Sequence, residues 1–123
     1  MAKKILHVLS QRPSRTGSGI TLESIVRHAA EHRWQQAAVV GVPISDPRPP
    51  VGNLPAKALF PLTFRDPAQP EATADLDFPL PGMSDVMPYT SSVWSQLNEN
   101  QLRQYREAWK KHLRRVIGEF QPD

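Results

Sequence analysis

The sequence predicts an α/β domain with about three parallel strands, two main helices and a long proline-rich loop. Three features carry this prediction: an apolar run at residues 5–9, a helix-periodic segment after it, and a second apolar run at residues 37–42. Parallel strands need a crossover of about a dozen residues, and the helical segment supplies one, with the usual right-handed connection. At 123 residues the chain is long enough for one small domain.

The first strand is expected to be buried on both faces. Its residues Ile5, Leu6, Val8 and Leu9 are interrupted only by His7. Near-continuous apolar runs of this kind are typical of parallel strands covered on both sides. We interpret His7 as a hydrogen-bonded neutral imidazole and not as a catalytic residue, because nothing in the sequence gives it a partner.

The first helix is predicted from apolar residues that recur at helical spacing. These residues are Leu22, Ile25, Val26, Ala29 and Ala30. Ser18 or Thr21 is expected to cap the helix start, and Gly19 to give the chain freedom just before it. His28 and His32 share one helix face and could hold a metal, but no HExxH motif accompanies them. We therefore interpret them as part of a polar outer face.

Residues 43–97 form a proline-rich region that a helix could not span. Eleven of the 13 prolines lie between Pro43 and Pro88. Within this region, residues 57–64 are predicted to form a third strand at the sheet edge, where Pro61 would cost least. The apolar residues of 78–89 are expected either to dock on the body of the domain or to line a cleft.

The last predicted element is a long amphipathic helix. Asn98 with Gln101 resembles a capping box, and Gly118 with Pro122 is expected to end the helix. Its apolar face consists of Leu102, Tyr105, Trp109, Leu113, Val116 and Phe120. Its other face carries six cations, Arg103, Arg106, Lys110, Lys111, Arg114 and Arg115. A basic helix can contact anionic membranes or nucleic acid, but the pairs Glu99–Arg103 and Glu107–Lys111 favour an ordinary exposed face.

Composition narrows the function classes only slightly. The formal net charge of +3 and the pI near 9.6 permit an anionic partner without requiring one. With no cysteine, disulfides and thiolate metal sites are excluded, which suits a reducing compartment. The apolar run at the N-terminus is too short for a signal peptide, and no run approaches the ~18–20 residues of a membrane span. We expect a cytoplasmic protein.

The strongest functional signal is the stretch KILHVLSQRPSRTGSG, from Lys4 to Gly19. A strand that leads through a glycine-containing loop to a helix start presents unpaired N–H groups and a partial positive charge, which suit a phosphate. The P-loop motif GxxxxGK[ST] is absent. The dinucleotide motif GxGxxG fails at Leu22, and the acidic residue expected near the tip of the second strand is missing, because that strand ends in Gly41, Val42 and Pro43. Dinucleotide binding is therefore disfavoured.

The segment KILHVLSQRPSRTGSGITLESIVRHAAEHRWQQAAVVGVP resembles the start of GT-B fold glycosyltransferases, in particular the large retaining group of sucrose and mannose transferases. The similar features are a KILHV-like strand, a glycine-rich loop, an amphipathic helix and a strand ending in VV. Arg33 stands where that family often has glycine. The segments SDVMPY and VIGEFQPD also look like that family. The resemblance is best over residues 4–42 and 97–123.

The resemblance implies the acceptor-side, N-terminal Rossmann-like domain of an enzyme that transfers a sugar from a nucleotide diphosphate donor to an acceptor sugar or lipid. The glycine-rich loop would approach the donor diphosphate. Carried over residue by residue, this substrate-binding role falls to Arg15, Thr16, Gly17, Ser18 and Gly19. The resemblance implies no catalytic residue in this chain, no metal and no cofactor beyond the nucleotide-sugar substrate.

The resemblance also predicts that residues 1–123 are only part of the N-terminal domain and that the donor-binding domain is absent. Alone, this part is expected to be inactive. A doubly wound sheet has about six strands, and the sequence indicates three. The first strand would then be an exposed edge, through which the chain could form a homodimer. Peripheral membrane contact stays open, and no nucleic-acid partner is expected from the resemblance. The alternative is a non-catalytic α/β module that uses its basic last helix on an anionic partner.

Overall fold

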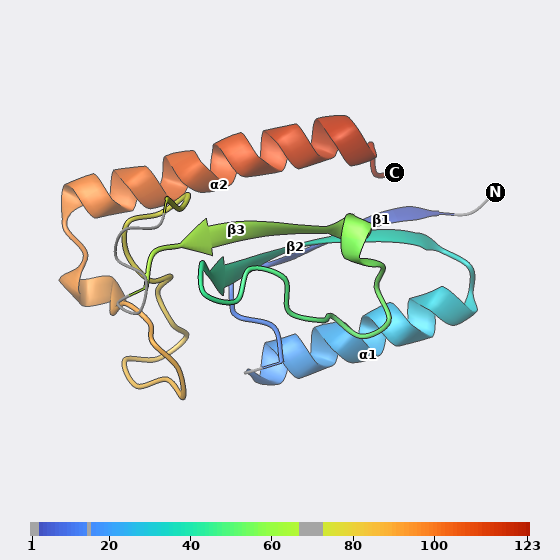
Figure 1. Ribbon diagram of the computed structural model, residues 1–123, viewed down its shortest axis with the longest axis horizontal. Helices are drawn as coiled ribbons and strands as arrows, with labels where there is room; N and C mark the ends of the chain where they lie inside the picture. Colours follow the sequence, from blue (N-terminus) through green and yellow to red (C-terminus); the bar gives the residue numbers. More distant parts are fainter. Residues whose placement is uncertain (1–2, 15, 67–72) are drawn as a thin grey trace.

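A computed structural model of the chain, in which residues 3–14, 16–66 and 73–123 are described, shows an open sheet with one helix on each face (Figure 1). The three strands are all parallel and lie in the order β1 (Lys4–Leu9), β2 (Gln35–Pro43) and β3 (Leu59–Phe64). This arrangement is that of an incomplete Rossmann-like fold. The predicted fold class is therefore confirmed.

The central strand β2 separates two hydrophobic cores. On one face, Leu22 and Val26 of helix α1 (Gly17–Glu31) pack with Ala38, Val40 and Val42. On the other face, helix α2 (Glu99–Phe120) covers Val39 with residues of β3 and of the segment after it. Alternate side chains of a strand point to opposite faces, so a strand covered by two helices must be apolar throughout. This requirement accounts for the uninterrupted apolar run at 37–42.

The expectation that β1 is buried on both faces is wrong. Its residues are mostly half-buried, and Val8 is 52% exposed. Among the described strands β1 pairs with β2 alone, so it forms one edge of the sheet. The edge position itself is as predicted. His7 is hydrogen-bonded, as expected: its Nε2 lies 2.7 Å from Oε1 of Gln36, whose own amide donates to the Val26 carbonyl at 3.0 Å.

The other edge strand, β3, accommodates Pro61 without losing a sheet hydrogen bond. The Thr63 N–H points away from β2 and donates to the Asp75 carboxylate at 2.9 Å. Pro61, two residues earlier, faces the same way, so its missing N–H lies on the open side of the strand. The predicted edge strand is thus confirmed at 59–64, whereas residues Ala56–Ala58 form a short 3-10 turn before it.

The apolar residues after β3 dock on the domain. Leu76, Phe78 and Leu80 are buried in the core between the sheet and α2. Leu80 lies over Gly41 of β2, so closely that a Cβ at this glycine would come within 1.7 Å of a Leu80 methyl carbon. Of the two alternatives for residues 78–89, the structure shows docking for these side chains.

Helix α2 begins with the predicted capping box, in which Gln101 N–H donates to the Asn98 side chain and the Gln101 side chain accepts from Asn98 N–H. The prediction that Gly118 ends the helix is wrong: the helix continues to Phe120, and Gln121 terminates it in the left-handed conformation. The last residue, Asp123, then lies beside the start of β1, where its N–H donates to the Lys4 carbonyl at 2.9 Å. Figure 1 shows the two ends of the chain close together.

Neither of these helices, within the part of the chain that the structure describes, has the length and apolar character needed to cross a bilayer.

The contact between Gly41 and Leu80 predicts a specific stability coupling. Gly41→Ala should lower the free energy of unfolding by about 1–3 kcal/mol, because the new methyl group forces the buried Leu80 out of its position. In a Leu80→Ala background the same substitution should cost little. Urea denaturation of the two single variants and the double variant measures the coupling. An equal cost of Gly41→Ala in both backgrounds would contradict it.

Candidate functional site

The carboxyl ends of the three strands lie together on one side of the sheet, on the left in Figure 1, and we call this end of the sheet the carboxyl edge. The chain leaves β1, β2 and β3 there, and α1 begins there. Open α/β sheets bind their ligands at this edge, because loops of different strands converge there without a helix to cover them. We therefore take the carboxyl edge as the candidate functional site.

The predicted glycine loop is the first turn of α1. Gly17, Ser18 and Gly19 are helical, and the N-cap is Thr16, whose hydroxyl accepts a hydrogen bond from Gly19 N–H at 2.9 Å. The expectation that Ser18 or Thr21 caps the helix is wrong. Thr16 has the extended backbone conformation that lets a cap side chain reach the N–H three residues on. Arg15, the fifth predicted site residue, lies outside the described residues.

The two glycines have different surroundings. A Cβ on Gly19 would lie 2.7 Å from the Ser14 nitrogen and 3.1 Å from the Arg12 carbonyl oxygen, so the preceding loop can pack on the helix only at glycine. A Cβ on Gly17 would meet nothing within 4 Å. Gly19 therefore has a structural role here, whereas the packing of this chain does not explain Gly17.

The N-terminus of α1 offers free hydrogen-bond donors. Among the described residues no partner contacts the N–H groups of Gly17 and Ser18, and the first turn contains no acidic residue. The hydroxyls of Thr16 and Ser18 lie 3.1 Å apart beside them. The helix dipole adds a partial positive charge, so this turn favours an anion such as a phosphate.

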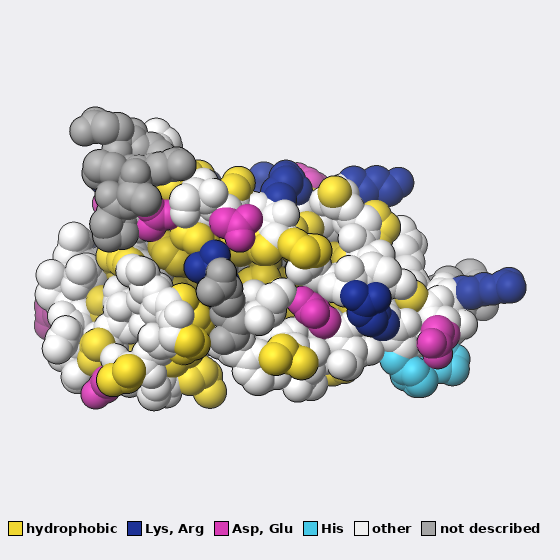
Figure 2. Space-filling model, turned by 60° about the horizontal axis from the view of Figure 1, so that its bottom comes forward, with side chains coloured by type: hydrophobic (Ala, Val, Ile, Leu, Met, Phe, Trp, Pro, Cys, Tyr) yellow, Lys and Arg dark blue, Asp and Glu magenta, His cyan; other side chains and the backbone are white. Residues whose placement is uncertain are grey.

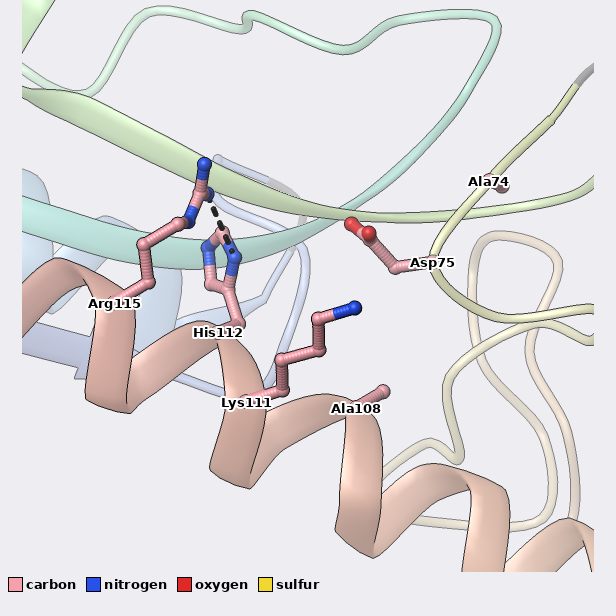
Figure 3. Close-up of a pocket in the computed structure, with 6 residues that line it drawn as sticks. All are labelled: Ala74, Asp75, Ala108, Lys111, His112 and Arg115. Atoms are coloured by element: carbon pink, nitrogen blue, oxygen red, sulfur yellow. Dashed lines mark hydrogen bonds between the residues drawn. The ribbon is translucent and has the colours of Figure 1, made fainter.

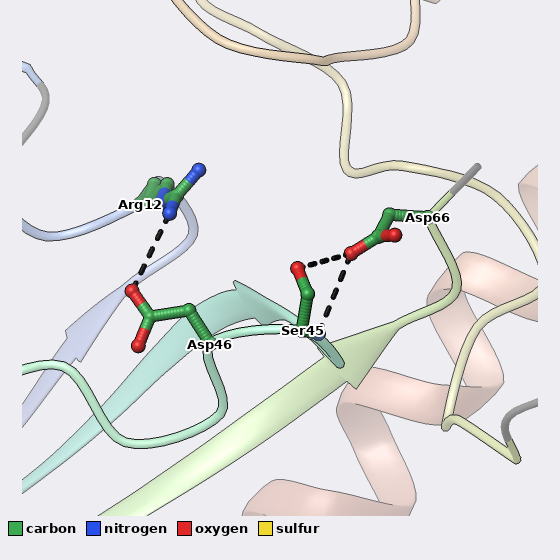
Figure 4. A network of polar contacts seen from close by, with 4 residues as sticks. All are labelled: Arg12, Ser45, Asp46 and Asp66. Atoms are coloured by element: carbon green, nitrogen blue, oxygen red, sulfur yellow. Dashed lines mark hydrogen bonds and ion pairs between the residues drawn. The ribbon is translucent and has the colours of Figure 1, made fainter. Parts of the chain in front are cut away.

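Four polar side chains connect the three strand-end loops, and we call Arg12, Ser45, Asp46 and Asp66 the strand-end network (Figure 4). Arg12, after β1, forms an ion pair with Asp46, after β2, at 3.4 Å. Ser45 donates to the carboxylate of Asp66, after β3, through both its N–H and its hydroxyl. The network holds loops from three strands together at the candidate site.

A second pair of side chains connects the same edge to the segment after β3. Gln11 is 6% exposed; its amide donates to the Pro81 carbonyl at 3.3 Å, and its Oε1 accepts from the Tyr89 hydroxyl at 2.8 Å. Burial raises the pKa of Tyr89 above its ordinary value of 10.0, against smaller opposing effects of Arg12. The phenol is therefore protonated at neutral pH and acts as a donor.

Sequence reasoning missed these residues. Gln11, Arg12, Ser45, Asp46 and Asp66 each stand within three positions of a strand end, and the rule that ligands bind at carboxyl ends could have found them. Tyr89 has no such signal, because only the docking of residues 76–81 brings it to the edge.

The two histidines at the end of α1 pack against each other on the surface, where Figure 2 shows histidine side chains gathered beside an acidic one. The rings of His28 and His32 pack edge to face with centroids 5.0 Å apart, and His28 lies 3.6 Å from Glu31. Within residues 3–14, 16–66 and 73–123, no three His, Cys, Asp or Glu side chains are grouped as metal ligands. The polar-face interpretation is in keeping with these contacts.

Comparison with known protein-family models, curated proteins and solved structures gives no match to this chain. The residues and geometry of the carboxyl edge are therefore the structural basis for assigning a function to this chain.

The two glycines predict opposite effects on stability. Gly17→Ala should raise the free energy of unfolding by up to about 1 kcal/mol, because alanine restricts the unfolded chain and has room in the folded one. Gly19→Ala should lower it by about 1–3 kcal/mol, because the methyl group collides with the backbone of Ser14. Urea denaturation of both variants tests this, and a loss of stability in Gly17→Ala would show that the turn is packed differently.

Proposed function

We propose that this chain forms the acceptor-side, N-terminal domain of a nucleotide-sugar-dependent glycosyltransferase with the GT-B fold. The observation that carries the proposal is the joint position of the α1 N-terminus and the strand-end network at the carboxyl edge. An anion-binding helix turn beside loops rich in hydroxyl and carboxylate groups suits a ligand that carries both phosphate and sugar.

In this proposal the first turn of α1 faces the donor diphosphate. The free N–H groups of Gly17 and Ser18 are the donors, and the open space at Gly17 lets the diphosphate approach the backbone. Arg12, whose side chain is 18% exposed, contributes a positive charge from the neighbouring loop. The nucleotide is held mainly by a second domain, and no catalytic residue is assigned to this chain.

The acceptor binds, in the same proposal, over the ends of β2 and β3. Ser45 and the carboxylates of Asp46 and Asp66 can exchange hydrogen bonds with sugar hydroxyls, and Tyr89 adds a phenol nearby. The described residues already pair these groups with one another, so they are held in place before a ligand arrives. Preorganised polar groups of this kind lose little entropy on binding.

The end of α2 gives further support. On the open side of β1, the Asp123 N–H donates to the Lys4 carbonyl at 2.9 Å. The Lys4 N–H donates in turn to the Asp123 carboxylate, also at 2.9 Å. A doubly wound sheet of order 3-2-1-4 places its fourth strand at this position. The described strands, in the order β1-β2-β3, are compatible with that topology.

The proposal predicts that a bulky side chain at position 17 impairs sugar transfer without impairing folding. In the protein expressed from its complete reading frame, Gly17→Leu should reduce turnover of UDP-, GDP- or ADP-sugars by about tenfold or more, because it displaces the diphosphate from its donors. Gly118→Leu is the matched control, since Gly118 is also a helical glycine with open space around it. Absence of turnover with every donor, or equal activity of the two variants, would overturn the proposal.

A second candidate, a non-catalytic module for an anionic partner, is favoured by α2. All six of its cations are exposed, and among the described residues its only ion pair joins Lys110 to Glu107, at 3.7 Å, in place of the expected Glu107–Lys111 pair. This candidate predicts salt-dependent binding to anionic vesicles that is lost on reversing Arg106, Lys110 and Arg114 to glutamate. Vesicle sedimentation at two salt concentrations measures it, and unchanged binding by the reversed variant would contradict it.

A further inference from the structure

A pocket of about 420 Å³ lies between α2 and the segment beside β3, away from the strand-end network. Figure 3 shows it from close by: one wall comes from α2 and the opposite wall from the segment after β3. It is lined by Ala74, Asp75, Ala108, Lys111, His112 and Arg115, and we call it the α2–β3 pocket. Its volume is in the range of small-molecule sites.

A buried histidine positions one cation of this pocket. His112 is 7% exposed; its Nε2 lies 2.8 Å from the Phe60 carbonyl oxygen, and its Nδ1 lies 3.1 Å from Nη2 of Arg115. These contacts require the tautomer that donates through Nε2 and accepts at Nδ1. The ring thus connects the guanidinium of Arg115 to the backbone of β3. One guanidinium nitrogen is engaged, so the remaining N–H donors stay available to a ligand.

A second cation points into the same space. Lys111 projects from α2 toward Asp75 in Figure 3. Among the described residues, neither Lys111 nor Arg115 has a carboxylate within 4.0 Å. The pocket therefore holds two positive charges on one wall that no described acidic side chain neutralises directly.

The opposite wall supplies a fixed acceptor. Oδ2 of Asp75 accepts from the N–H of Thr63 at 2.9 Å and from its hydroxyl at 3.1 Å. Its other oxygen, Oδ1, has no hydrogen-bond partner among the described residues. A carboxylate oxygen of this kind accepts a hydroxyl donor but repels an anion placed against it.

We propose that the α2–β3 pocket binds the phosphate monoester of a small polyol. The phosphate lies against Lys111 and Arg115, where Arg115 can offer two parallel N–H donors, and a hydroxyl of the polyol donates to Asp75. The opposite charges of the two walls favour a ligand with one phosphate and neutral hydroxyl groups. A second anionic group would lie against the Asp75 carboxylate, and a neutral polyol would leave both cations without a partner. The inference does not rest on glycosyl transfer, because the pocket lies outside the carboxyl edge.

The probe is glycerol 3-phosphate, titrated into the ¹⁵N-labelled chain and followed by amide shifts of Lys111, His112 and Arg115. We expect saturable shifts in the wild type. Lys111→Gln and Arg115→Gln should each weaken binding by about tenfold, as expected for loss of a charged hydrogen bond. Arg114→Gln is the matched control, since it removes the same charge from an exposed position outside the pocket. Lys111 makes no described contact within the fold, so its variant tests binding without risk to folding.

Asp75→Asn tests the hydroxyl contact separately. It should strengthen binding of inorganic phosphate, because a like charge is removed, and reduce the preference for glycerol 3-phosphate over inorganic phosphate. Absence of saturable binding to the wild type would overturn the proposal. So would equal weakening in Arg114→Gln and Arg115→Gln, which would indicate general attraction to a basic helix. None of these outcomes depends on the presence or absence of sugar-transfer activity.

Discussion

Burial of β2 on both faces is the constraint on which the rest of the fold depends. Ala37, Ala38, Val39, Val40 and Val42 are all 0% exposed, and each face of the strand requires its own apolar cover. The crossover helix α1 covers one face. The other needs α2 together with Leu76, Phe78 and Leu80. The proline-rich region is therefore partly core, because its buried residues complete the layer that α2 alone does not fill.

The same constraint fixes the position of the polar residues. Where the three strands end, the helices no longer cover them, and the loops satisfy their polar groups with one another. Arg12 with Asp46 and Ser45 with Asp66 are contacts between loops of neighbouring strands. The core and the candidate site therefore both follow from the parallel pairing of the strands, because parallel strands in register have their carboxyl ends on the same side of the sheet. The α2–β3 pocket has another origin, since it arises where α2 passes the edge of β3.

The sequence was sufficient for the fold class because hydrophobic periodicity reports local structure. The capping box at Asn98, the strand around Pro61 and the apolar run of β2 were all predictable from nearest neighbours in sequence. The wrong predictions concern the burial of one strand and the ends of the two helices. Val8 is exposed, and among the strands that the structure describes none pairs with the outer side of β1. Gly118 lies inside helix α2, which ends instead at Gln121 in the left-handed conformation. Thr16 caps α1 in place of Ser18, so the glycine turn was placed on the wrong side of the helix boundary.

The site was less predictable than the fold, since it depends on contacts between distant segments. Gln11 meets Tyr89 across 78 residues, and Ser45 meets Asp66 across 21. Strand ends indicate where such residues belong, but not which of them pair. The α2–β3 pocket was equally hard to predict from the sequence. Its residue His112 is one of several polar residues on α2, and only its contact with the Phe60 carbonyl, 52 residues away, distinguishes it.

The contact between Lys4 and Asp123 has a consequence for the order in which the molecule assembles. These residues are 119 positions apart, whereas β1, α1 and β2 follow one another directly. Contacts between chain termini form late and open at low free energy, so the contact between Lys4 and Asp123 should open before the buried strand pairs do. The carboxyl edge and its strand-end network lie at the other end of the strands. Opening of the Lys4–Asp123 contact therefore breaks none of the contacts of the strand-end network.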